Sequence, residues 1–201
     1  MPYIYKMSNA GGMSTLTRYT DMLAGNATFI DSSFESISTV SVGAGGAASI
    51  TFSSIPATYT HLQIRFIARS TYASGNIDIV GMQLNSDTAN NYAWHWLFGD
   101  GSSAGAGSAT TTSNITFRDI SNANTTANTF GAFVIDILDY ANTSKYKTSR
   151  ALGGYDANGN GKINLDSGVW MNTSAVSNIA LYAGNANFAQ YSSFALYGIK
   201  G

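Results

Sequence analysis

The sequence predicts an all-β protein, an antiparallel β-sandwich that is jelly-roll-like and carries an extended N-terminal arm. From residue 37 onward, apolar and polar residues alternate in short runs, which is the pattern of strands with one buried face. Clusters of Gly, Asn, Asp and Ser separate these runs and are typical of turns, and no stretch has a convincing helical period. Two packed sheets are an economical way to bury so many one-sided strands.

The first element is the segment of residues 1–36, which we expect to be the arm. It holds four of the six methionines, several Gly and Thr, and no sustained period. A segment of this kind becomes ordered mainly against a partner. We expect Tyr3, Ile4 and Tyr5 to be its apolar anchors on that partner. The sandwich domain follows over residues 37–201.

The strands of the sandwich follow in order along the chain, and we expect about ten of them. Their runs cover residues 40–42, 50–52, 62–68, 92–98, 115–117, 133–138, 149–155, 162–170, 179–183 and 194–196. The main turn clusters are NSDTANN (85–91), FGDGSSAGAG (98–107), DANGNG (156–161) and AGNAN (183–187). Pro56 falls between two runs, where its missing N–H costs no ladder hydrogen bond. The short spacing favours antiparallel connections, because parallel crossovers would need helices.

The composition argues against an enzyme and against a cofactor. The chain has two histidines (His61 and His95), no cysteine and a single glutamate (Glu35), and only 10% of its residues are charged. General acid–base catalysis draws mainly on the residue types that are scarce here. The net charge is −1 with no basic stripe, so we expect no nucleic-acid partner. No apolar run reaches 18 residues, so we expect no membrane span.

Two glycine motifs resemble catalytic signatures. The segment 43–48 matches the GxGxxG/A dinucleotide pattern, but an alternating strand rather than a helix follows it, so we expect a glycine hairpin. The segment 101–105 matches GxSxG around Ser103. The hydrolase fold that uses this elbow places its histidine after the serine, whereas His61 and His95 both precede Ser103. We therefore expect no serine catalysis, although another fold could pair His95 with a serine.

Two sets of oxygen ligands leave alternatives open. Asp156, Asn158 and Asn160 match the first ligand positions of an EF-hand calcium loop, but the twelfth position is Ser167 instead of a bidentate glutamate. We interpret the loop as a tight hairpin and keep a weak calcium site as the alternative. Asp136 and Asp139 could be the carboxylate pair of a glycosidase. Turn and surface roles are the interpretation that we favour for them.

Aromatic residues gather on the run that begins at Tyr92. Trp94 and Trp96 share its face, and we expect them to be core or subunit contacts, as period-two aromatics on strands usually are. The alternative is a platform on which sugar rings stack, made by Trp94, Trp96 and Trp170.

Several phrases, in their order, resemble a family of small β-rich virion structural proteins of tailed bacteriophages. They are ITFSSIPATYTHLQIRFIARS (50–70), LNSDTANNYAWHWLFGDGSSA (84–104), NANTTANTFGAFVIDILDYANTSKYKT (122–148) and FALYGIKG (194–201). The resemblance covers about residues 37–201 and leaves the arm outside. It implies a jelly-roll-like sandwich, usually a homotrimer, that serves as a capsid decoration (cement) protein or as part of a tail fibre or tail tip. It carries over no catalytic residue.

We therefore expect a decoration protein on the capsid surface of a virion. It would bind the major capsid protein and copies of itself as a homotrimer, with many weak contacts adding up over a symmetric interface. The alternative is a tail-fibre or tail-tip module that recognises host surface glycans.

Overall fold

The structure is a computed structural model, and it describes residues 3–4, 17–18 and 33–201. The chain forms two compact units, Met1–Ser32 and Ser33–Gly201. In the first unit, β1 (Tyr3–Ile4) pairs antiparallel with β2 (Thr17–Arg18), and Tyr5 lies outside the described residues. The second unit begins with β3 at Phe34, so the boundary at residue 36 falls inside a strand.

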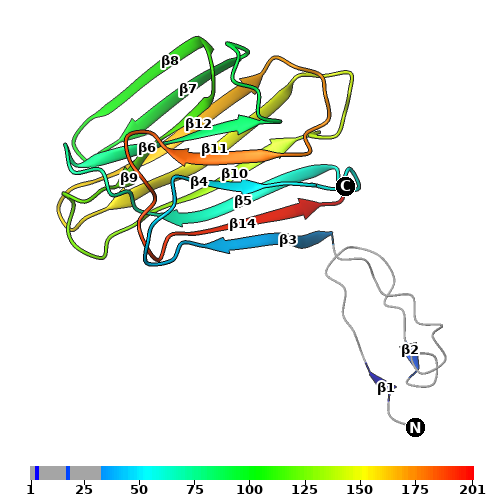
Figure 1. Cartoon of the computed structure of the whole chain (residues 1–201), viewed down its shortest axis with the longest axis horizontal. Helices are drawn as coiled ribbons and strands as arrows, with labels where there is room; N and C mark the ends of the chain where they lie inside the picture. The colour runs from blue at the N-terminus through cyan, green and yellow to red at the C-terminus, as the bar shows by residue number, and fades with distance from the viewer. Residues whose placement is uncertain (1–2, 5–16, 19–32) are drawn as a thin grey trace. The chain divides into compact units, whose positions relative to one another are not determined.

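The second unit is an antiparallel β-sandwich, which confirms the predicted fold class (Figure 1). Its described strands are β3 (Phe34–Ser41), β4 (Ser49–Phe52), β5 (His61–Ala68), β6 (Ile77–Leu84), β7 (Tyr92–Gly99), β8 (Ala104–Thr112), β9 (Ile115–Ser121), β10 (Gly131–Leu138), β11 (Lys147–Asp156), β12 (Gly161–Trp170), β13 (Ile179–Ala183) and β14 (Ser193–Ile199). The large sheet has the order β3-β14-β5-β10-β11-β12-β7-β8, and the small sheet has the order β4-β13-β6-β9.

Eight of these strands form a jelly roll. The chain forms one long hairpin that is folded over on itself. Its first half runs from β3 to β6 and its second half from β9 to β14, and the two halves pair as β3·β14, β4·β13, β5·β10 and β6·β9. The first and third pairs lie in the large sheet, and the other two pairs make up the small sheet. This is the wrapped double Greek key of a jelly roll.

Two inserted hairpins extend the large sheet beyond the jelly roll. The hairpin β7–β8 is inserted between β6 and β9, and the hairpin β11–β12 is inserted between β10 and β13. They join edge to edge through the β12·β7 pair, so that β3 lies at one edge of the sheet and β8 lies at the other (Figure 1). The large sheet is therefore twice as wide, in strands, as the sheet that packs on it.

The core lies between the two sheets and follows the predicted alternation. Phe133, Ile135 and Ile137 of β10 are buried, as are the alternating residues Leu62, Ile64 and Phe66 of β5 and Ile179 and Leu181 of β13. The edge strand β9 of the small sheet packs against β11, β12 and β7 and covers part of the inserted hairpins. Burying alternate aliphatic and aromatic side chains in this way is the main driving force for the fold.

Strand β8 differs from the prediction, which placed all of residues 98–107 in a turn. Its sequence AGAGSATTT has no large apolar residue, so it gives no alternation signal. The structure supplies the reason for the small residues. A Cβ at Gly105 would lie 2.5 Å from the Phe98 ring, and a Cβ at Gly107 would lie 2.8 Å from Nε1 of Trp96. The rings of β7 thus lean over the glycines of β8.

Candidate functional site

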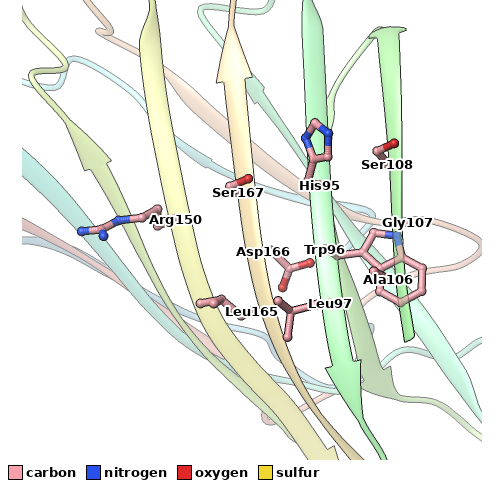
Figure 2. Close-up of a pocket in the computed structure, with 10 residues that line it drawn as sticks. All are labelled: His95, Trp96, Leu97, Ala106, Gly107, Ser108, Arg150, Leu165, Asp166 and Ser167. Atoms are coloured by element: carbon pink, nitrogen blue, oxygen red, sulfur yellow. The ribbon is translucent and has the colours of Figure 1, made fainter. Parts of the chain in front are cut away.

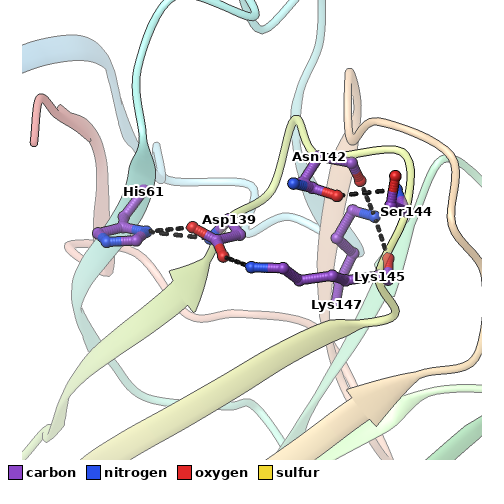
Figure 3. A network of polar contacts seen from close by, with 6 residues as sticks. All are labelled: His61, Asp139, Asn142, Ser144, Lys145 and Lys147. Atoms are coloured by element: carbon purple, nitrogen blue, oxygen red, sulfur yellow. Dashed lines mark hydrogen bonds and ion pairs between the residues drawn. The ribbon is translucent and has the colours of Figure 1, made fainter.

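The two histidines lie apart and do not assemble a catalytic group. His61 Nδ1 accepts a hydrogen bond from the Asp139 backbone N–H at 3.0 Å, and the Asp139 carboxylate binds Lys145 Nζ at 2.5 Å (Figure 3). Lys145, through its hydrogen bond and its charge, holds the pKa of Asp139 below its usual value. His95 is exposed on the opposite, outward-facing side of β7 from Trp94 and Trp96. Among the described residues, no group of three or more His, Cys, Asp or Glu could hold a metal ion.

Lys147 is a buried lysine that ties two loops together. Its ammonium donates hydrogen bonds to the backbone carbonyls of Asn142 at 2.6 Å and Lys145 at 2.8 Å (Figure 3). A third hydrogen bond goes to the backbone carbonyl of Thr173 at 3.0 Å. Burial lowers the pKa of Lys147, whereas the three acceptors satisfy its donors. The side chain is thus used to close the loops at one end of the sandwich.

Replacing Lys147 with methionine is expected to lower the free energy of unfolding by about 3 kcal/mol, because three carbonyls lose a charged donor. Urea unfolding measures this loss. Lys145→Met is the matched control: its side chain is 60% exposed, so its removal should change the free energy of unfolding little. Equal effects of the two substitutions would contradict a structural role for Lys147.

The glycine motifs form turns. In the segment 43–48, the Gly46 N–H donates to the Gly43 carbonyl, and Gly46 has a φ of 70° that favours glycine. No helix follows, so the segment lacks the amide cradle that a dinucleotide needs. Ser103 Oγ donates to Asp100 Oδ2 at 2.8 Å in the β7–β8 turn, where Asp100 also accepts from the backbone N–H groups of Ser102 and Ser103. This arrangement caps a turn, and among the described residues no histidine hydrogen-bonds Ser103.

The DANGNG loop is the tight turn of the β11–β12 hairpin, flanked by strands instead of helices. Asp156 Oδ1 accepts the Asn158 N–H at 2.8 Å, and Asn160 Oδ1 accepts the Tyr155 hydroxyl at 3.1 Å. Two of the three oxygens proposed for calcium therefore already accept internal hydrogen bonds. The two carboxylates considered for a glycosidase each have a different partner. Asp136 accepts a hydrogen bond from Gln63 Nε2, and Asp139 accepts one from Lys145 Nζ.

The tryptophans do not form an open stacking platform. Trp94 and Trp170 are buried, and Trp170 Nε1 donates to Asp87 Oδ2 at 2.7 Å. Trp96 is half-buried, lies over Gly107 (Figure 2) and has the Arg118 guanidinium 4.8 Å from its ring centroid. Trp94 has the same guanidinium at 5.2 Å. These contacts hold the tryptophans in the folded unit, and the three rings do not form one exposed surface.

A buried group of charges lies where β9 meets β12 and is the feature that sequence reasoning missed. Asp166 and Asp119 are almost fully buried, and neither carboxylate oxygen of Asp166 has a hydrogen bond of good geometry, although the backbone N–H of Arg118 favours the charged form of Asp166. Lys162 Nζ lies 3.8 Å from Asp119 Oδ2. Burial, with a smaller contribution from the charge of Asp119, raises the pKa of Asp166 to about 7, while Arg118 opposes the rise. Burial also raises the pKa of Asp119.

The outer face of the large sheet, which points away from the small sheet, carries six of the ten large hydrophobic side chains that are exposed among the described residues. Direct cross-strand partners on it form three adjacent rows. The polar row is Gln63, Asp136, Arg150, Ser167, His95 and Ser108. The apolar row is Val134, Leu152, Leu165, Leu97 and Ala106, and it ends on β5 at Arg65, the partner of Val134. The small row is Ile67, Ala132, Gly154, Ile163, Gly99 and Ala104.

Six aliphatic side chains of these rows are between 38% and 61% exposed, namely Ile67, Leu97, Val134, Leu152, Ile163 and Leu165. Together they expose roughly 500 Å² of apolar surface, about as much as the largest apolar patch on a typical monomer. Figure 2 shows Leu165 and Leu97 next to each other, with Arg150, Ser167 and His95 in the adjacent row. A depression of about 570 Å³ lies along this part of the face. A contiguous apolar surface with a polar border is typical of a protein interface.

Neither the protein-family models, the curated proteins nor the solved structures contain a match to this chain. In the part of the chain that the structure describes, no helix is long and apolar enough to cross a membrane. The outer face is the candidate functional site because its exposed aliphatic side chains and polar border suit binding.

Proposed function

We propose that the chain is a structural protein of a phage virion, a decoration protein that binds the outer shell of the capsid as a trimer. The observation that carries this proposal is the outer face, where two inserted hairpins widen the large sheet and present aliphatic side chains to solvent. The inward-facing side chains of these hairpins, such as Trp94 and Trp170, join the core, whereas their outward-facing side chains lengthen the outer face. The added surface therefore suits contacts with other protein subunits.

The residues that resemble phage virion proteins point to the same kind of role. In the described residues, the histidines and the candidate carboxylates are engaged in turns, loop contacts or separate strands, so the geometry supports assembly better than turnover. We assign attachment to the shell to the arm, with Tyr3, Ile4 and Tyr5 as its anchors. The folded unit Ser33–Gly201 then serves as the decorating body.

Deleting residues 2–30 is expected to leave a folded body that no longer attaches to capsids, because the whole sandwich core lies in residues 33–201. Co-sedimentation with empty capsids measures attachment, and thermal unfolding checks the fold. The full-length chain is the control. Normal attachment of the truncated protein would contradict the role of the arm.

The alternative function is binding of host glycans at a tail fibre or tail tip, and the capsid-binding experiment distinguishes it from capsid decoration. If the full-length chain does not bind empty capsids but binds cells or a glycan array, the result would contradict decoration and favour receptor recognition. The burial of Trp94 and Trp170 argues against a platform of tryptophans as the means of such recognition.

A further inference from the structure

The three rows of the outer face are complementary to one another in shape. The apolar row contains the branched side chains of Val134, Leu152, Leu165 and Leu97, whereas four of the six members of the small row beside it are Gly154, Gly99, Ala132 and Ala104, and the other two are Ile67 and Ile163. A depression of about 730 Å³ is lined by small-row residues, including Gly99, Gly154 and Ile163. Rows on one face of a sheet are two residues apart along each strand, or about 7 Å. A ridge and a groove thus lie side by side.

The face is also complementary in charge along the strands. Arg150 stands in the polar row, on one side of the apolar row, and is exposed. Asp156 and Asp100 line the depression at the other side, beyond the small row. No ion pair joins Arg150 to another of the described residues. The Asp156 carboxylate accepts one hydrogen bond, from the Asn158 N–H to Oδ1. Arg150 and Asp156 therefore lie at opposite ends of the face on β11, with Asp136 beside Arg150 in the polar row and Lys162 beside Asp156 at the depression.

We propose that this face docks on the outer face of a second copy of the chain, about a twofold axis that lies between the two sheets and runs across the strands. Such an axis reverses the order of the rows and keeps β11 opposite β11. The apolar row of each copy then lies over the small row of the other. Arg150 of each copy faces Asp156 of the other, and His95 approaches the turn that holds Asp100. The inference rests on the proposed function only in treating the outer face as a protein interface.

The size of the face suits a stable contact. Six strands at about 4.8 Å and three rows at about 7 Å give roughly 29 by 20 Å, or about 600 Å² on each copy. Stable interfaces bury roughly 600–1,000 Å² per partner. Two sheets stacked face to face also keep their strands nearly aligned, as in a sandwich. A twofold contact uses the same patch twice, so one self-complementary surface is sufficient.

The first test removes the ridge. Leu152→Glu with Leu165→Glu in the full-length chain is expected to halve the mass measured by light scattering, from dimer to monomer, or from hexamer to trimer if a threefold contact also exists. Tyr146→Glu, on a loop side chain that is 55% exposed, is the control and should leave the mass unchanged. Thermal unfolding checks that each variant is folded. A wild-type chain that is only a monomer or only a trimer, or a mass unaffected by the two glutamates, would overturn the pairing.

The second test checks the register through charge. Arg150→Glu and Asp156→Lys are each expected to raise the dissociation constant of the pair by about tenfold or more, because like charges then meet across the axis. The double variant should return to within about threefold of the wild type. Additive weakening in the double variant would overturn this register. Chains that pair but do not bind empty capsids would contradict the proposed function and leave the pairing standing.

Discussion

Replacing Trp94 with alanine is expected to lower the free energy of unfolding by about 3–5 kcal/mol, the usual cost of removing a large buried aromatic side chain. Trp94 is only 9% exposed and belongs to the cluster of buried side chains between the two sheets. Its loss also removes the contact with the Arg118 guanidinium, 5.2 Å from the ring centroid. Urea unfolding of the full-length chain measures the change.

The matched control for Trp94 is Tyr146→Ala, which removes an aromatic ring that is largely exposed. Its expected effect is under about 1 kcal/mol, because few atoms pack on the ring. A comparably small effect of Trp94→Ala, together with weakened glycan binding, would support the stacking platform instead of a core role.

The free energy of unfolding is expected to fall by about 4 kcal/mol at most as pH rises from about 4 to about 7. Asp166 has an ordinary pKa of 3.8, and burial raises this pKa to about 7 in the folded protein. Between these values the folded state holds a proton that the unfolded state has lost. The stabilisation is therefore complete below pH 4 and is lost as pH rises through the folded pKa. Asp119, whose pKa is also raised by burial, acts in the same direction.

Asp166→Asn separates this contribution from the others, since the amide has nearly the same shape and does not titrate. The variant should lose most of the fall between pH 4 and pH 7 and should be the more stable protein above pH 7. Chemical unfolding at a series of pH values measures both effects. Asp136→Asn is the control, because Asp136 lies on the outer side of β10 and binds Gln63. An unchanged pH profile in Asp166→Asn would show that this carboxyl is not the group that titrates.

Much of the fold was predictable because a strand with one buried face has alternating apolar and polar residues in its sequence. The alternation over β5, β7, β10 and β13 placed the right residues in the core, and the Gly and Asn clusters marked the turns. The segment 43–48 could be recognised as a turn because its sequence continues as a strand, but the hairpin expected there is wrong, since β3 pairs with β14 in the large sheet and β4 pairs with β13 in the small sheet. Strands β6 and β8 lay outside the predicted runs, and the small residues of β8 are explained only by the rings of β7 that lie over them.

The candidate site was less predictable, because a burial pattern does not say which face another sheet covers. In β12, Ile163 and Leu165 point to solvent whereas Asn164 and Asp166 point inward. Alternation alone would place the two aliphatic residues in the core. Pairing with β7 decides the matter, because Trp96 and Phe98 face inward and their partners Asp166 and Asn164 must share that face.

The sequence by itself determined the all-β class, the turn positions and the scarcity of reactive side chains, since these depend on local alternation and composition. Only the tertiary structure decided that two hairpins join edge to edge to widen one sheet, that Asp119 and Asp166 share a buried space, and that aliphatic residues from five strands meet on one outer face. Each of these depends on strand pairing between segments far apart in the chain, and the register of that pairing is set by long-range packing that no local pattern contains.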